Sequence, residues 1–337
     1  MIIDVHAHLY PGPYHQLVEP LGLGGSLYRP KGAAGPSTPY PRQPEDVGRR
    51  LAAMDAAGVE RQILSINIAP YLENEADAVR AARLANDLAA EFCAAHPDRF
   101  SFWASLPLPH VDEAIAEAGR AIDELGAVGV TIQCFCLDES IAREEFDPLY
   151  AELDRRGIVV FLHPGQNALQ APLIGDWGLT TCAGASIEDA VAAMHLIARD
   201  HPGRYPAIRF IVPHFGGILP MLLQRLDGQM PRQDLPRPPS ETARGFYYDT
   251  VGWGSKAALV AGVTAFGVDQ LVPGSDWPIL LRWESYTQTF AHIREGGLDP
   301  ADAHRILHVN AQRLMTPHIQ RSTPILERLQ RENHNGA

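Results

Sequence analysis

The chain of 337 residues has little of what marks nucleic-acid-binding or membrane proteins. Its net charge of −12 comes without any basic block or basic amphipathic helix, which argues against a nucleic-acid partner. No uninterrupted apolar run reaches the length that crosses a membrane. The first predicted strand begins at residue 2, which leaves no room for a signal peptide. We therefore expect a cytoplasmic protein that binds neither nucleic acid nor membrane.

Cysteines and phosphate-binding glycines are also scarce. The four cysteines form neither a C-x-x-C pair nor a disulfide framework. Cys134 and Cys136 share one face of a strand-like run and could be soft metal ligands, although we favour small core residues in a reducing compartment. No glycine fingerprint follows the first strand, which disfavours a dinucleotide-binding fold.

What the chain does contain is a regular alternation of apolar strand-length segments with amphipathic helices. The predicted strands are 2–9, 62–66, 100–106, 129–134, 158–163, 208–212, 246–249 and 270–276. Short apolar strands separated by helices predict a parallel sheet covered on both faces. About eight such units in this length predict one α/β domain over residues 1–337, a closed (β/α)8 TIM barrel.

Two segments fall outside this alternation. Residues 11–44 are rich in glycine, proline and tyrosine and show no periodicity, which predicts a long insertion loop after the first strand. Loops of this length are usually functional, and we interpret this one as a lid over the barrel mouth. The polar residues 318–337 are expected to form a C-terminal tail.

The polar residues at the strand ends are the candidates for chemistry. In such a barrel the active site lies at the C-terminal mouth, where the ends of several strands meet. Alternation along the first strand places His6 and His8 on the same side, while His163, His214 and Asp276 lie at the ends of three later strands. One histidine at a strand end is more often structural than functional. Five such residues on four strands are difficult to explain as core residues, so the sequence predicts a metal site.

Three imidazoles and one carboxylate suit Zn²⁺, the favoured ion, or another divalent first-row ion such as Mn²⁺. The predicted ligands are His6, His8, His163 and Asp276. Such an ion could lower the pKa of a bound water or polarise a substrate oxygen. The fourth strand offers Thr131 and Gln133 but no lysine, whose carboxylated form commonly bridges two metals in such barrels. We therefore expect one metal ion and no organic cofactor.

A series of short motifs covers nearly the whole chain. They are Asp4-Val5-His6-Ala7-His8, Met54-Asp55-Ala56-Ala57-Gly58-Val59, Pro97-Asp98-Arg99-Phe100, Leu162-His163-Pro164, His214-Phe215-Gly216-Gly217, Gly274-Ser275-Asp276-Trp277-Pro278 and Asn310-Ala311. With these motifs in this order, the chain resembles the amidohydrolase superfamily. Within it, the chain is similar to the branch of α-amino-β-carboxymuconate-ε-semialdehyde decarboxylase, with the 6-methylsalicylate and γ-resorcylate decarboxylases.

This resemblance implies roles for particular residues. It implies the same four metal ligands, with His214 as an acid/base group beside them. It also implies that Arg29 and Arg225 bind the carboxylate of a small carboxylic-acid substrate, which a guanidinium group can hold through two hydrogen bonds. In relatives the arginine matching Arg225 reaches a neighbouring subunit's site, so a homodimer or higher homo-oligomer is expected. The alternative for Arg225 is an ordinary solvated helix residue.

The implied function is metal-dependent, non-oxidative decarboxylation of a small hydroxy-aromatic or unsaturated carboxylic acid. Two routes remain open: His214 activates a water that acts on the substrate, or Asp276 or a nearby acid protonates the carbon directly. The alternative function is a hydrolase of a lactone, an amide or a C–C bond, or a hydratase. A catalytically inactive binding protein would require a broken ligand set, and all five positions are present.

Overall fold

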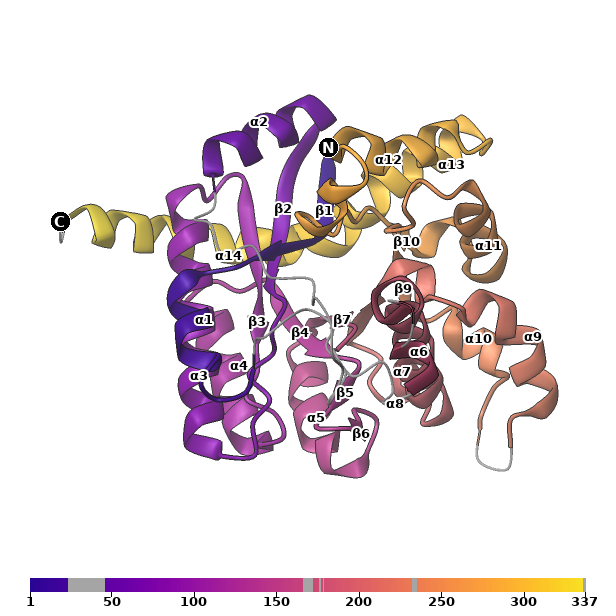
Figure 1. The fold of residues 1–337 in the computed structure, drawn as a ribbon, viewed down its shortest axis with the longest axis horizontal. Coiled ribbons are helices and arrows are strands. Elements are labelled where there is room, and N and C mark those ends of the chain that lie inside the picture. The colour runs from indigo at the N-terminus through magenta and orange to yellow at the C-terminus, as the bar shows by residue number, and fades with distance from the viewer. Residues whose placement is uncertain (24–45, 166–171, 176, 178, 232–234, 336–337) are drawn as a thin grey trace.

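The computed structural model describes residues 1–337 except 24–45, 166–171, 176, 178, 232–234 and 336–337. Eight parallel strands, each paired with its neighbour, form the centre of the molecule (Figure 1). In spatial order they are β1 (Ile2–Leu9), β2 (Val59–Ile66), β3 (Phe100–Ser105), β4 (Gly129–Gln133), β7 (Val159–His163), β8 (Arg209–Val212), β9 (Tyr247–Asp249) and β10 (Leu271–Val272). The predicted (β/α)8 barrel is confirmed.

The barrel closes where β1 meets the segment that follows β10. The amide of Val5 donates to the carbonyl of Pro273 at 3.0 Å, and the amide of His8 donates to the carbonyl of Trp277 at 2.7 Å. A parallel bridge joins Ala7 to Trp277 between these two contacts. Because of this closure, the first and last strands of the barrel hold their functional residues side by side.

A bulge in β1 directs its histidines into the barrel. Asp4 pairs with Gln62 and Ala7 with Leu64, so three steps along β1 match two along β2. Ile3, before the bulge, and Val5, within it, pack in the barrel interior, whereas Ala7 and Leu9, after it, pack in the layer under the helices. One extra residue reverses which side chains face inward. His6 and His8 therefore face the barrel axis above an apolar floor.

That floor is a separate cluster of apolar side chains inside the barrel. Trp103 and Phe161 stack there with ring centroids 5.7 Å apart. A Cβ atom on Gly129 would lie 2.7 Å from the Trp103 ring and 2.4 Å from the carbonyl oxygen of Val159, so only glycine leaves room for the indole at that position. The interior below the histidines is therefore filled and offers no path for substrate.

Helices surround the strands, with α3 and α4 on one side of the view and α9, α10 and α11 on the other (Figure 1). In the described residues they are α1 (Gly12–Val18), α2 (Val47–Ala57), α3 (Glu75–Ala95), α4 (Val111–Asp123), α5 (Asp147–Arg155), α6 (Pro172–Gly175), α7 (Ala185–Ala198), α8 (His201–Arg204), α9 (Leu219–Gln229), α10 (Pro239–Ala243), α11 (Lys256–Phe266), α12 (Tyr286–Glu295), α13 (Pro300–His304) and α14 (Asn310–Asn335). None of the helices in this part of the chain is long and apolar enough to cross a membrane.

The segment expected to be one loop over residues 11–44 begins with a helix. Helix α1 occupies Gly12–Val18, and its Tyr14 and Val18 are fully buried. The hydroxyl of Tyr14 donates to the carbonyl of Ile68 at 2.7 Å, which ties the helix to the end of β2. The helix has only two turns, so its apolar periodicity is too short to be recognised among the surrounding glycines and prolines. Residues 24–45, the greater part of the predicted lid, lie outside the described residues.

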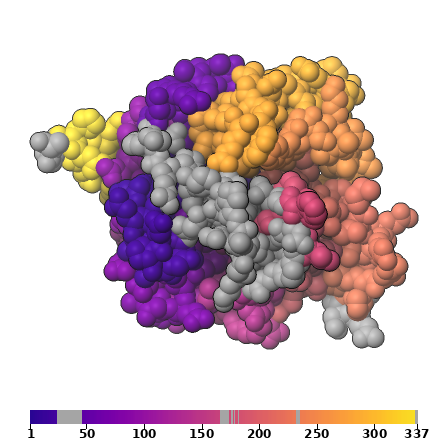
Figure 2. All heavy atoms as spheres, viewed as in Figure 1, coloured from indigo at the N-terminus to yellow at the C-terminus, as the bar shows by residue number. Residues whose placement is uncertain are grey.

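The expected C-terminal tail over 318–337 is also wrong, because α14 continues to Asn335. Leu326 is fully buried, and the Ser322 hydroxyl donates to the carbonyl of Gly126. Leu326 and Leu329 belong to an apolar stripe that packs toward α3 between charged residues. The last residues of α14 extend beyond the body of the molecule (Figures 1 and 2).

A short hairpin follows β4, formed by β5 (Phe135–Cys136) and β6 (Glu139–Ser140). Cys134 and Cys136 are both buried and free, as expected for core residues.

Candidate metal centre

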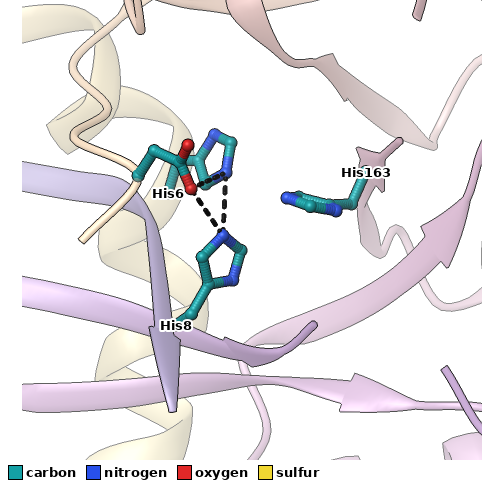
Figure 3. A group of neighbouring side chains, drawn as sticks. His6, His8 and His163 are labelled. Atoms are coloured by element: carbon teal, nitrogen blue, oxygen red, sulfur yellow. Dashed lines mark hydrogen bonds and ion pairs between the residues drawn. The ribbon is translucent and has the colours of Figure 1, made fainter. Parts of the chain in front are cut away.

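Four predicted ligands lie together at the C-terminal mouth of the barrel. One ligand atom from each of His6, His8, His163 and Asp276 lies within 4.8 Å of all the others, and all four residues are buried. The Nε2 atoms of His6 and His8 are 3.2 Å apart, and the carboxylate of Asp276 lies 2.9 Å from Nε2 of His8. Figure 3 shows the His163 ring facing the other two imidazoles across an open space.

Each imidazole is held from behind by an acceptor for its Nδ1 atom. Asp249 Oδ2 lies 2.7 Å from Nδ1 of His6, Ser65 Oγ lies 2.8 Å from that of His8, and the carbonyl oxygen of Pro164 lies 3.0 Å from that of His163. A carboxylate or a carbonyl can only accept, so Nδ1 of His6 and of His163 carries the proton. Their Nε2 atoms therefore direct lone pairs into the space between the rings, as in metal-ligating histidines.

The distances between these side-chain atoms fit a bound cation. An ideal tetrahedral zinc site with bonds of about 2.0–2.1 Å separates its ligand atoms by roughly 3.3 Å. The separations around His6, His8 and Asp276 are 2.9, 3.2 and 3.6 Å. Converging lone pairs and a carboxylate in a buried space repel one another unless a positive charge lies between them.

The protonation states also suit a metal ion. Burial lowers the pKa of His8, and it lowers that of His163 well below the ordinary value. Burial alone would raise the pKa of Asp276, but the hydrogen bond from His8 and the neighbouring imidazoles outweigh it and lower the pKa. Near neutral pH, His8 and His163 are therefore neutral and Asp276 is ionised, which are the forms that ligate metals.

His214 lies beside these four residues and is held by two other carboxylates. Its ring centroid is 5.3 Å from that of His6 and 6.5 Å from that of His163. Its amide donates to Asp249 at 2.8 Å, and its Nδ1 lies 2.8 Å from Oδ2 of Asp189. The backbone of His214 is left-handed, with φ 53°, a conformation that non-glycine residues adopt at some cost.

Charge around His214 favours its protonated form. Burial lowers its pKa, but the charge and the hydrogen bond of Asp189 outweigh burial and raise the pKa to about 9. Burial also raises the pKa of Asp189, although the facing imidazole partly opposes this. A dication held nearby would repel a proton on His214 and move its pKa back toward neutrality. With an ion in place, the pKa of His214 would be closer to that of a group that exchanges a proton near physiological pH.

A cavity of about 590 Å³ opens from His214 and Asp276. Its other walls are largely apolar and include Phe215, Val251 and Trp253. Its size and lining suit a small ligand with an apolar body and one polar end directed toward the imidazoles.

The other predicted site residues are placed differently. Arg225 is exposed on α9, where its Nε donates to Gln229 at 3.0 Å, and it does not line the cavity of its own chain. Arg29 lies outside the described residues. On β4, the side chain of Gln133 donates to the carbonyl of Asn67 at 3.0 Å instead of facing a second metal.

Sequence reasoning missed Asp249 and Asp189. Asp249 ends β9, and both it and Asp189 are fully buried. The rule that identified His163 and His214, a polar residue at the end of an apolar strand, would have found Asp249. Asp189 lies on α7 in the same stripe as Ala193 and Leu196, so the available signal was a carboxylate on a buried helix face.

The fold and the cluster at its mouth define a (β/α)8 barrel with a histidine–carboxylate site that could hold a metal ion. The amidohydrolase family model matches residues 3–315, and the chain belongs to that family.

Relatives and solved structures agree with this assignment. The chain is 30% identical over 284 residues to a gamma-resorcylate decarboxylase of Rhizobium, which covers 79% of this chain and 85% of that protein. It is 31% identical over 308 residues to the 6-methylsalicylic acid decarboxylase of Penicillium expansum, covering 86% and 90%. The structure of a 2,6-dihydroxybenzoate decarboxylase, solved with 2,6-dihydroxybenzoate, superposes with a TM-score of 0.76 at 25% identity, covering 94% of this chain and 98% of that one.

Proposed function

We propose that this chain is a metal-dependent, non-oxidative decarboxylase of a small hydroxy-aromatic carboxylic acid. The observation that carries the proposal is the convergence of four ligand atoms within 4.8 Å of one another. They lie beside an apolar cavity that His214 and Asp276 also line. Relatives at about 30% identity over most of the chain are decarboxylases of this class, which supports the same chemistry here.

We propose that His6, His8, His163 and Asp276 hold one divalent ion. Such an ion would supply positive charge that stabilises negative charge developing on the reacting group. A structure of this fold from Polaromonas, 24% identical, contains manganese, so Mn²⁺ and Zn²⁺ are both to be tested. No organic cofactor is part of the proposal.

The reaction needs one proton and releases one CO₂. The bond between the ring carbon and the carboxyl carbon breaks, its electron pair stays on the ring carbon, and that carbon takes up the proton. We assign proton transfer to His214, whose Nδ1 is committed to Asp189 and whose ring faces His6 and His163. Protonation by Asp276 is the alternative. The walls of Phe215, Val251 and Trp253 would hold the aromatic ring and exclude water.

The test is anaerobic incubation of the purified protein, loaded with Zn²⁺ or Mn²⁺, with 2,6-dihydroxybenzoate, 6-methylsalicylate and 5-carboxyvanillate. The expected result is one CO₂ for each arene formed, with a deuteron on the vacated ring carbon in D₂O. His214→Gln should retain the metal and lose turnover, whereas Asp276→Asn should lose both. If the protein only opens esters or lactones, or only adds water, the decarboxylase proposal is wrong.

We further propose that the chain works as a homodimer, in which Arg225 binds the substrate carboxylate in the partner's site and Arg29 binds it in its own. Arg225 is exposed on the same helix as Met221, which is 81% exposed at the rim of the cavity. Sedimentation should give twice the chain mass, and Arg225→Ala should raise KM about tenfold, the loss of one charged hydrogen bond. A monomer with unchanged KM would contradict this.

A cytoplasmic location is the last part of the proposal. Cys93, Cys134 and Cys136 are buried free thiols, which suits a reducing compartment. Cell fractionation tests it, and recovery of the protein outside the cytoplasm would contradict it.

A further inference from the structure

One buried carboxylate is not explained by the metal centre. Asp189 lies on the buried face of α7, which carries Glu188 and otherwise only alanine, leucine and isoleucine. Its Oδ2 faces Nδ1 of His214 at 2.8 Å, and the side chain is fully buried. A buried charge is costly and persists where its partner requires it. The partner in this case is a residue that lines the cavity.

We propose that Asp189 is a positioning residue that holds His214 in the tautomer with Nδ1–H, so that its Nε2 alone exchanges protons with the substrate. This inference rests on the proposed function of the site and adds to it a role for a residue that contacts neither the four ligands nor the cavity.

The geometry distinguishes this role from simple packing. An ionised carboxylate has no proton to donate, so the group that it faces at 2.8 Å must be the N–H of the ring. The main chain of His214 is fixed independently, since its amide donates to Asp249 at 2.8 Å. Removing Asp189 would therefore leave His214 in place but free to change its tautomer or rotate its ring.

The second oxygen of Asp189 provides a control. Its Oδ1 lies 3.6 Å from Sγ of the buried Cys134, a weak contact that does not involve His214. Cys134→Ala removes this contact and leaves the pair between Asp189 and His214 intact. Asp189→Asn keeps the size of the side chain and removes its charge, so the two variants disturb the same carboxylate in separable ways.

Steady-state kinetics of the metal-loaded, full-length protein test the proposal. We expect Asp189→Asn to lower kcat about 100-fold, with KM and metal content within twofold of wild type, because proton transfer contributes about this much to catalysis. Cys134→Ala should change kcat less than twofold. In a His214→Gln background, Asp189→Asn should have no further effect, since two residues that act as one unit are not additive.

A second measurement does not depend on turnover. In the metal-loaded wild type, ¹⁵N spectra of labelled histidine should show His214 with a protonated Nδ1. In Asp189→Asn, the same spectra should show a population of the Nε2–H tautomer of His214. An Nε2–H tautomer in wild type, unchanged kcat in Asp189→Asn, or additive losses in the double variant would each overturn the proposal. If the wild type decarboxylates no acid while its ¹⁵N spectra are as expected, the proposed function fails and the positioning role remains.

Discussion

The two sides of the barrel mouth are built differently. On the side of β2, β3 and β4, the space beside His163 is only about 10 Å³, room for about one water. Its polar groups bind one another: the Gln133 side chain donates to the main-chain carbonyl of Asn67 at 3.0 Å, and the Asn67 side chain donates to the hydroxyl of Tyr10 at 3.2 Å. On the side of β8, β9 and β10 the cavity measures about 590 Å³.

This difference assigns separate tasks to the two sides. The closed side has no room for substrate. The open side has a cavity of substrate size, and there Asp249 also holds His6 and His214. Substitutions of the groups that hold the imidazoles and of the apolar cavity walls should therefore separate metal content from KM.

The largest loss of metal and turnover is expected from His6→Ala, which removes one of the four clustered side chains. The loss of one imidazole should remove the metal and lower turnover by at least about 10³-fold, because a bound ion contributes several kcal/mol to the transition state. Metal analysis of the purified variant, together with CO₂ release, measures both. His334→Ala, on the exposed end of α14, is the control and should retain full metal. A His6→Ala protein with a full metal complement would show that the cluster is not the site.

A smaller loss of metal affinity is expected from Asp249→Asn. The carboxylate holds His6 Nδ1 at 2.7 Å, and removing such an outer partner typically costs 10–100-fold in metal affinity or activity. Competition with a chromogenic chelator gives the affinity. Asp269→Asn, an exposed carboxylate at the other end of the barrel, should leave the affinity unchanged. Equal affinities in wild type and Asp249→Asn would mean that this hydrogen bond does not support the site.

On the cavity side, Trp253→Ala should raise KM about tenfold, or about 1.4 kcal/mol, through the loss of part of an apolar wall. Metal content should not change. Trp283, whose ring centroid lies 4.4 Å from that of Trp253, does not line the cavity, so Trp283→Ala is a matched control with a smaller effect. If both variants change KM equally, the indole of Trp253 is not a specific contact.

The smallest effect concerns pH. The pKa of His8 and of His163 is lowered in the folded protein, whereas in the unfolded chain both take up protons near pH 6.5. Stability of the metal-free protein should therefore fall as the pH falls from 8 to 6, by about 1 kcal/mol or less for each imidazole. Urea unfolding at the two pH values measures this. His8→Asn/His163→Asn should show a smaller pH dependence, with the remainder due to other histidines of lowered pKa such as His201, and an unchanged slope would contradict the assignment.

The eight strands and the four residues clustered at their ends could be predicted because both depend on local pattern. A buried parallel strand must be apolar throughout, so a polar residue at its end, such as His163, stands out. Helix α1 could not be found, because two turns with Tyr14 and Val18 give too little periodicity among glycines and prolines.

Other features depend on contacts between distant segments. The bulge in β1 is visible only from its pairing with β2, where Ala7 lies opposite Leu64. The sequence alone correctly places His6 and His8 on one face, but it does not specify that this face is the inner one. The pair of Asp189 with His214 joins a helix to a strand end 25 residues away, and only the folded chain brings the two together.

The closure of β1 against the segment after β10 has a consequence for synthesis of the protein. The carbonyl of His6 accepts a hydrogen bond from the amide of Asp276 at 2.7 Å, so β1 acquires its second neighbour only after some 270 further residues have been synthesised. Until then, two imidazoles and an open strand edge are exposed on a nascent chain. Completion of the barrel and of the four-residue cluster at its mouth are therefore late events in translation, and a ribosome stalled before β10 would carry an aggregation-prone sheet.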